Sequence, residues 1–184
     1  ELHAQLASIR LGVESLRALA GRAGAGAVAC FMRRLKERAA VALAMALDRR
    51  GALEAAATDA LDDGTPIVVR LSRAGSGSRL RVDFSGSGEV HPGNLNATPA
   101  IVRSALIYVL RLVASCDLPL NEGLMRDVDL VLPEGVLSPP FDEDPARCPA
   151  VVGGNVETSQ RVVDVLVRAF GLAACSQGTM NNLI

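Results

Sequence analysis

The sequence predicts an α+β fold, in which an N-terminal helical hairpin precedes a small, mostly antiparallel sheet packed with two buried helices. The first observation is the spacing of apolar residues along the chain. They recur about every 3.6 residues in the N-terminal part, as in a helix, and every two residues after it, as in a strand. The order of elements, with helices before strands and single helices, also favours α+β over a doubly wound sheet. We therefore expect a helical hairpin over residues 1–60 and an α+β lobe over residues 61–184.

The N-terminal hairpin is predicted from two amphipathic patterns. Apolar side chains that recur every three or four residues lie on one stripe of a helix. In the first helix they are Leu2, Leu6, Ile9, Val13, Leu16 and Leu19. The glycine-rich residues 21–26 end this helix. In the second helix they are Val28, Phe31, Met32, Leu35, Ala39 and Leu43. Two such helices joined by a short turn predict an antiparallel pair.

The strands of the lobe are predicted from alternation with a period of two. Apolar side chains alternate with others over residues 67–71 and again over residues 80–84. The loop 73–78 contains two glycines and would join these strands as a hairpin. A third short strand is expected at residues 128–132, and the proline-rich residues 138–149 are expected to form an extended loop.

Two helices of the lobe have recognisable ends. Thr98 is an expected N-cap, and Pro99 occupies the first helical position, where its missing N–H costs nothing. The helix that follows is apolar nearly all round up to about Ser115, which predicts a buried position. A last helix is expected from about residue 156 to residue 170, ending at Gly171.

Composition excludes several classes of protein. The formal net charge is −1, and the basic residues form no broad field that could neutralise a nucleic-acid backbone. The longest apolar run, residues 101–113, is interrupted by arginines and is shorter than the roughly 20 residues that span a bilayer. The four cysteines lie far apart, which indicates reduced thiols and a cytoplasmic protein. We expect no nucleic-acid or membrane partner.

Familiar catalytic motifs are absent, and no metal site is expected in this chain. Its two histidines are too few for a histidine-rich metal site, and neither a nucleophile elbow nor a phosphate-binding loop is present. His91 falls in an expected loop and is interpreted as a surface residue.

Three polar, glycine-containing segments stand out: residues 92–96, 153–160 and 177–182. Glycine allows close approach of the backbone to a ligand, and Asn, Gln and Thr can orient a carbonyl, amide or phosphate without adding charge. The three segments could therefore converge on one small polar substrate.

Asn155 and Glu157 each allow two interpretations. Asn155 precedes an expected helix, whose free N–H groups and dipole would attract a phosphate or carboxylate. Alternatively, Asn155 is only the N-cap of that helix. Glu157 is either an acid favourable to the helix dipole or a general base.

The sequence resembles the hydantoinase B/5-oxoprolinase family. The resemblance is carried, in order and spacing, by residues 82–86, 93–97, 103–105, 118–121, 133–135, 154–160 and 177–182. The helical start also resembles the family, so the resemblance extends over the whole chain. It implies that the chain is an internal piece of the B-type half of a larger enzyme.

The resemblance implies a chemistry shared between two halves. An A-type subunit or domain binds ATP and phosphorylates a carbonyl oxygen of a cyclic amide, and the B-type half completes the ring opening of 5-oxoproline or a hydantoin. A divalent metal is possible in the region before Glu1, and the enzyme is expected to be an oligomer. The piece alone is expected to be inactive.

The expected site residues come from the three polar segments. Glu157 is the expected catalytic residue. The expected substrate-binding residues are Asn94, Asn96, Gly154, Asn155, Gln160, Gln177, Gly178, Thr179 and Asn181. Two alternatives remain open: a lobe of a ketone carboxylase, or a non-catalytic scaffold that packs on the A-type half.

Overall fold

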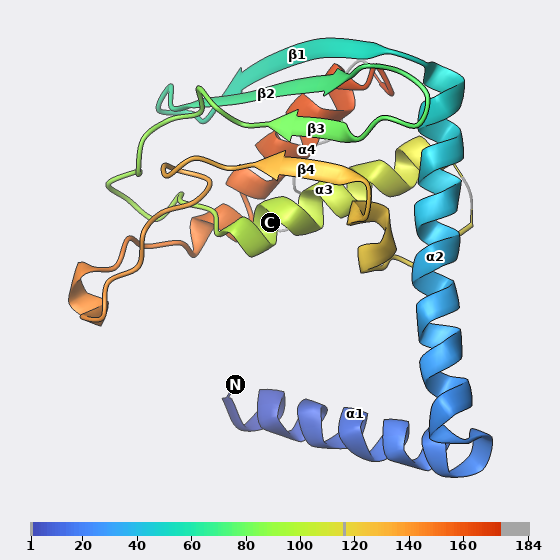
Figure 1. Ribbon diagram of the computed structural model, residues 1–184. Coiled ribbons are helices and arrows are strands. Elements are labelled where there is room, and N and C mark those ends of the chain that lie inside the picture. The colour runs from blue at the N-terminus through green and yellow to red at the C-terminus, as the bar shows by residue number, and fades with distance from the viewer. Residues whose placement is uncertain (1, 116, 174–184) are drawn as a thin grey trace.

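The computed structural model describes residues 2–115 and 117–173, in which two long helices lead into a four-stranded sheet covered on one face by two further helices (Figure 1). The main elements are α1 (Leu2–Ala23), α2 (Ala25–Arg50), β1 (Leu53–Ala60), β2 (Pro66–Arg73), β3 (Leu80–Asp83), α3 (Pro99–Ala114), β4 (Val128–Val131) and α4 (Thr158–Ala169). Short 3₁₀ turns are η1 (Glu122–Met125), η2 (Pro145–Arg147) and η3 (Gly153–Asn155). The predicted α+β class is confirmed.

The sheet has the order β1-β2-β3-β4. Its first two pairs are antiparallel, and β3 pairs with β4 in parallel. The pairing of Leu71 with Val82 and of Leu80 with Val128 brings apolar side chains onto the same face. The predicted alternation in β2 therefore has the expected effect, since it points one row of side chains into the core.

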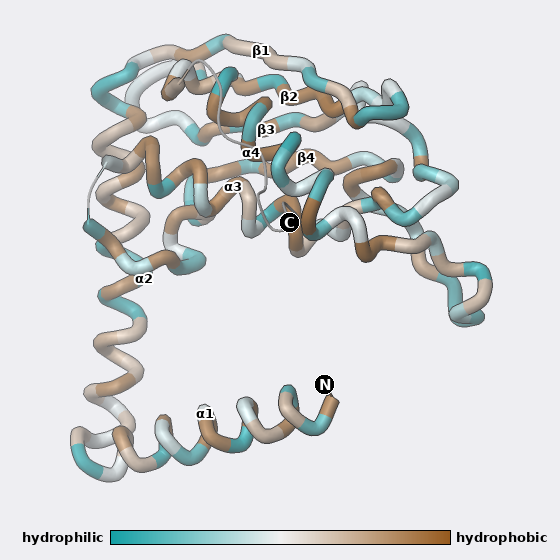
Figure 2. Tube along the Cα trace, turned by 180° about the vertical axis from the view of Figure 1, so that it is seen from behind, coloured by the Kyte–Doolittle hydropathy of each residue, from teal (hydrophilic) through white to brown (hydrophobic). Residues whose placement is uncertain are grey.

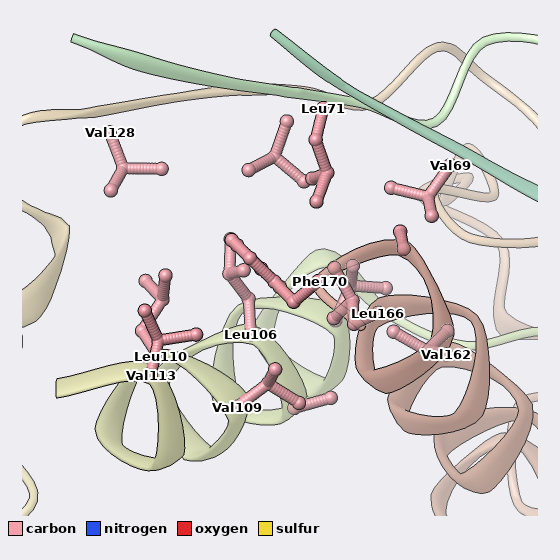
Figure 3. Packing of buried hydrophobic residues seen from close by; sticks show 14 of the residues in the cluster. Val69, Leu71, Leu106, Val109, Leu110, Val113, Val128, Val162, Leu166 and Phe170 are labelled. Carbon is pink, nitrogen blue, oxygen red and sulfur yellow. The ribbon is translucent and has the colours of Figure 1, made fainter. Parts of the chain in front are cut away.

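The core lies between this face of the sheet and the helices α3 and α4. Figure 3 shows Val69 and Leu71 of the sheet above Leu106 of α3 and Leu166 of α4. Each of these side chains is fully buried. Burying one Leu or Val side chain stabilises a fold by ~1.5–3 kcal/mol. The prediction of two buried helices is confirmed.

The start of α3 follows the predicted capping pattern. The Thr98 hydroxyl accepts a hydrogen bond from the backbone N–H of Ile101 at 3.4 Å, and Pro99 is the first helical residue. The last helix differs from the prediction, because it begins at Thr158 and residues 153–155 form a separate 3₁₀ turn. Gly171, just beyond this helix, has a φ of 62°, the left-handed conformation expected of a terminating glycine.

Strand β1 was missed by the sequence prediction, which placed residues 53–60 in the helical hairpin. Its sequence is rich in Ala, a strong helix former, and Ala57 is its one buried residue. Pairing with all eight residues of β2, together with packing of α4 beneath both strands, outweighs that local preference. The boundary of the helical part therefore lies near Gly51, where α2 ends with a φ of 75°.

The predicted pair of N-terminal helices is present, but the two helices do not lie along one another. They meet at Gly24, whose φ is 87°, and α1 then runs away from α2 (Figures 1 and 2). The C-terminal half of α2 packs on the lobe through buried Leu43 and Leu47. No residue of α1 is buried by the described part of the chain. Among the described residues, no helix is long and apolar enough to cross a membrane.

Candidate functional site

Two of the three polar segments lie against each other. The backbone N–H of Gly153 donates to the carbonyl of Asn94 at 2.8 Å, and the Thr158 hydroxyl donates to the carbonyl of Leu95. Gly154 is buried against the backbone of Asn96. The expected convergence of residues 92–96 and 153–160 is therefore seen at the level of the backbone. The third segment, with Gln177, Gly178, Thr179 and Asn181, lies outside the described residues.

Asn96 holds this junction together from inside. Its side chain is fully buried, and its oxygen accepts from the backbone N–H of His91 at 2.7 Å. Its amide nitrogen donates to the carbonyls of His91 at 2.9 Å, Ala150 at 3.0 Å and Gly93 at 3.3 Å. Every polar atom of this side chain is already bonded within the protein. The side chain of Asn96, which is predicted to bind substrate, thus links His91 and Gly93 to Ala150, just before the second segment.

An open groove of about 680 Å³ lies next to this junction, between α3 and the start of α4. One wall comes from α3 and the other from η3 and α4. Its lining residues are Ala100, Ile101, Ser104, Ala105, Tyr108, Asn155, Ser159, Gln160 and Val163. None of them is charged, so the groove combines neutral hydrogen-bonding groups with apolar contacts. Apolar surface with a few placed polar groups is typical of sites that bind small molecules.

Two of the predicted substrate-binding residues, Asn155 and Gln160, line this groove. Asn155 is not the N-cap of the last helix, because that position is occupied by Glu157, which makes no side-chain capping bond. The N–H groups of Val156 and Glu157 both donate to the carbonyl of Gly153, at 3.1 and 2.8 Å. These two donors are therefore engaged, and an anion at this turn would have to use other groups.

Three other predicted residues within the described part of the chain, Glu157, Asn94 and Gly154, do not line the groove. Glu157, the predicted catalytic residue, is exposed at the position before α4 and is not part of the lining. Asn94 is exposed, and its side-chain oxygen lies beside Gly153, where an added Cβ would be 3.1 Å from it. Gly154 is buried and supports the backbone junction rather than the groove surface.

Three polar residues of the groove were not among the expected site residues: Ser104, Tyr108 and Ser159, the last of which lies within the polar segment 153–160. Both serine hydroxyls donate to the carbonyl four residues earlier in the chain, Ser104 to Ala100 and Ser159 to Asn155, each at 2.9 Å. Ser104 and Tyr108 are four residues apart on α3, so they share one helix face. An exposed Ser and Tyr at this spacing, within an otherwise apolar helix, were the signal in the sequence.

His91 is largely enclosed rather than a surface residue, with 11% of its side chain exposed. Its Nδ1 accepts from the backbone N–H of Gly93 at 2.9 Å, and its Nε2 lies 2.7 Å from a carboxylate oxygen of Asp63. Because Nδ1 accepts, Nε2 carries the proton and donates to Asp63. The ring therefore ties the turn at Asp63 to the loop that precedes Asn96.

The carboxyl of Asp63 has a pKa lowered from 3.8 to about 2. The main cause is the backbone N–H of Thr65, which donates to it at 2.9 Å, followed by the Thr65 hydroxyl and then by the His91 ring. Hydrogen bonds to the ionised form favour that form. In the described part of the chain, no group of three or more His, Cys, Asp or Glu could hold a metal ion.

The fold and the groove together define an α+β lobe with a neutral site between two helices. The chain belongs to the Hydantoinase B/oxoprolinase family, whose profile matches residues 1–184. The resemblance seen in the sequence motifs is thereby confirmed.

Three curated relatives illustrate the similarity. A 5-oxoprolinase of Dictyostelium discoideum is 36% identical over 191 residues, covering 100% of this chain and 15% of the relative. The 5-oxoprolinase 1 of Arabidopsis thaliana is 34% identical over 197 residues, covering 100% of this chain and 15% of the relative. A 5-oxoprolinase of Saccharomyces cerevisiae is 33% identical over 186 residues, covering 99% and 14%. The chain therefore spans about one seventh of the length of these relatives.

A solved structure shares the fold. The ATP-dependent caprolactamase from Pseudomonas jessenii aligns with a TM-score of 0.70 and 23% sequence identity. The alignment covers 94% of this chain and 30% of that chain. The lobe described here is thus a part of a larger architecture in that protein.

Proposed function

We propose that the chain is part of the B-type half of an ATP-dependent cyclic amide hydrolase, and that the groove between α3 and α4 contributes to its substrate site. The single observation that carries this proposal is the position of Asn155 and Gln160. Sequence motifs selected both residues, and both line one uncharged groove. The relatives named 5-oxoprolinase, and a caprolactamase with the same fold, act on rings that contain an amide, which supports this substrate class.

The lining is suited to such a ring. The side-chain amides of Asn155 and Gln160 can each donate to a ring carbonyl and accept from a ring N–H. On the opposite wall, Ile101 and Tyr108 offer apolar surface for ring methylenes. We propose substrate-binding roles for Asn155 and Gln160, a positioning role for Asn96, and a supporting role for the backbone at Gly154.

The reaction itself would be shared with an A-type half, which binds ATP. Phosphorylation of the amide oxygen turns an unreactive amide into an imidate-like ester. Water then adds to the activated carbon, and the carbon–nitrogen bond of the ring breaks as the nitrogen takes up a proton. A second water hydrolyses the resulting acyl phosphate to a carboxylate and inorganic phosphate. In this scheme the present chain holds and orients the ring, and alone it is inactive. We further propose a cytoplasmic, oligomeric enzyme.

A test uses the complete polypeptide that contains this chain, supplied with its A-type half. The rate of ATP hydrolysis is measured with 5-oxoproline, hydantoin or caprolactam added. At least one of these three cyclic amides should be required for it. Gln160→Ala should raise the KM for the amide by about three- to tenfold, the value of one neutral hydrogen bond, and leave the KM for ATP unchanged.

A matched control is Glu54→Gln, which alters an exposed residue of β1 outside the groove and should leave both constants unchanged. ATP hydrolysis that responds to ketones and to none of the three amides would instead favour the carboxylase alternative. Unchanged kinetics in both Gln160→Ala and Asn155→Ala would favour the scaffold alternative.

A further inference from the structure

Helix α1 presents an apolar stripe that the described part of the chain leaves uncovered. Leu2, Leu6, Ile9, Val13 and Leu16 are between 43% and 75% exposed. Helix α1 leads into the N-terminal end of α2 and stands apart from the lobe (Figures 1 and 2). Helices in water derive most of their stability from packing of an apolar face, and large exposed apolar patches mark interaction surfaces.

The spacing of this stripe indicates what kind of structure covers it. From Leu2 to Leu16 its members lie alternately four and three residues apart, an average of 3.5, and Leu19 follows three residues later. A period near 3.5 is that of a helix that packs lengthwise along another helix. On α2, Val28, Met32, Leu35 and Ala39 recur with the same four- and three-residue steps, and Ala46 lies seven residues after Ala39. Near its end Ala39 and Ala46 pack on the lobe, whereas Met32 and Leu35 are exposed. The apolar stripe is therefore buried against the lobe at the C-terminal end of α2, whereas a stripe of similar spacing on α1 is exposed.

The charged residues of the N-terminal helices indicate the charge of the partner. Residues 2–50 contain nine Arg and Lys residues and three acidic residues, whereas residues 51–184 contain ten basic and sixteen acidic residues. On α1, Arg10 and Arg17 fall beside the apolar stripe, one position after Ile9 and Leu16. A second copy of α1 would present the same basic residues beside its own stripe, so it offers no charge complementarity to Arg10 and Arg17. A partner with acidic residues beside its own apolar stripe complements this surface.

We propose that α1 is a docking surface for an amphipathic helix with acidic flanks, located in the remainder of the larger enzyme to which this chain belongs. The proposal rests on the proposed function, in which the chain is one piece of that enzyme. The relatives have ample sequence to supply such a helix, since this region covers 14–15% of their length. The partner helix buries the stripe, and its carboxylates pair with Arg10 and Arg17.

Hydrogen exchange tests the proposal directly. In the 184-residue chain the amides of α1 should exchange nearly as fast as unstructured peptide, and in the complete enzyme they should slow by at least about a hundredfold. Fast exchange of α1 in both would overturn the proposal. Strong protection already in the 184-residue chain would also overturn it. Protection that rises with concentration would identify a second copy as the occupant, and concentration-independent protection another part of the same chain.

Substitutions in the complete enzyme make the test specific. Ile9→Asp should abolish the protection of α1, whereas Leu11→Asp, an equally exposed residue on the opposite helix face, should leave it unchanged. Arg17→Glu should weaken the protection more than Arg22→Glu, which lies away from the stripe. Equal effects within either pair would contradict the proposal. Because Gln160→Ala affects amide kinetics and not α1, failure of the docking proposal is distinguishable from failure of the proposed function.

Discussion

A Cβ atom added to Gly154 would lie 2.1 Å from the backbone carbonyl oxygen of Asn96. A nonbonded carbon atom cannot approach an oxygen so closely, so the two polar segments touch backbone to backbone and admit only glycine at this position. The contact fixes the chain direction just before Asn155 and so places that residue at the groove. The glycine is thus required by a neighbour that is far away in sequence.

Gly154→Ala is expected to destabilise the lobe by about 1–3 kcal/mol, because the new methyl group must displace backbone rather than a flexible side chain. Urea denaturation followed by circular dichroism measures this. Gly12→Ala on α1 is the control, since nothing lies within 4 Å of its added Cβ and the lobe should be unaffected. An unchanged midpoint for Gly154→Ala would show that the two segments do not pack as described.

Asn96→Asp should also destabilise the lobe. The change keeps the shape but removes the amide N–H donors to three carbonyls, so buried acceptors lose their partners. Leaving buried polar groups unsatisfied costs about 1–3 kcal/mol each, and a buried carboxylate adds to this. The free energy of unfolding is again the measurement. Asn94→Asp, at an exposed position two residues earlier, should change it little.

Asp63 is expected to make the stability pH-dependent. Its pKa falls from 3.8 to about 2 on folding, so its contribution is fully present above pH 3.8 and is lost as the pH falls toward 2. In Asp63→Asn, the denaturation midpoint should therefore fall less steeply as the pH is lowered from 3.8 to about 2. The neighbouring Asp62→Asn should not, because the Asp62 side chain is 97% exposed and has only a 3.5 Å ion pair with Arg161. Identical pH profiles for the two variants would contradict the assignment.

Glu157 can be tested against Gln160 in the complete enzyme. Because Glu157 does not line the groove, Glu157→Gln should change kcat for the cyclic amide by less than about threefold, below the usual contribution of a general base. A loss of kcat by a hundredfold or more would support the predicted catalytic role of Glu157. The pH profile of kcat separates the two cases, since loss of a general base removes its acidic limb.

Local signals in the sequence were sufficient for most individual elements. Thr98 and Pro99 marked the start of α3, and alternation marked β2, because caps and periodicity act within a few residues. The signals failed where distant contacts outweighed local preference. The alanine-rich residues 53–60 favour helix by themselves and become a strand only through pairing with β2.

The site divides in the same way. Motifs in the sequence identified Asn155 and Gln160, and both line the groove. The same motifs grouped Asn96 with them, although its amide bonds to Ala150, 54 residues away, and it is buried. A sequence motif gives the residue type at each position. It does not show whether the side chain faces the groove or forms hydrogen bonds to the backbone behind it.

By itself, the sequence determined the family, the α+β class and the glycine- and amide-rich character of the polar segments, since residue type and local spacing carry all three. Only the tertiary structure decided which polar residues face the groove, that His91 bonds to Asp63, and that the stripe on α1 lacks a partner among the described residues. The reason is physical. Burial and hydrogen bonding between segments depend on contacts across tens of residues, and no local pattern encodes those contacts.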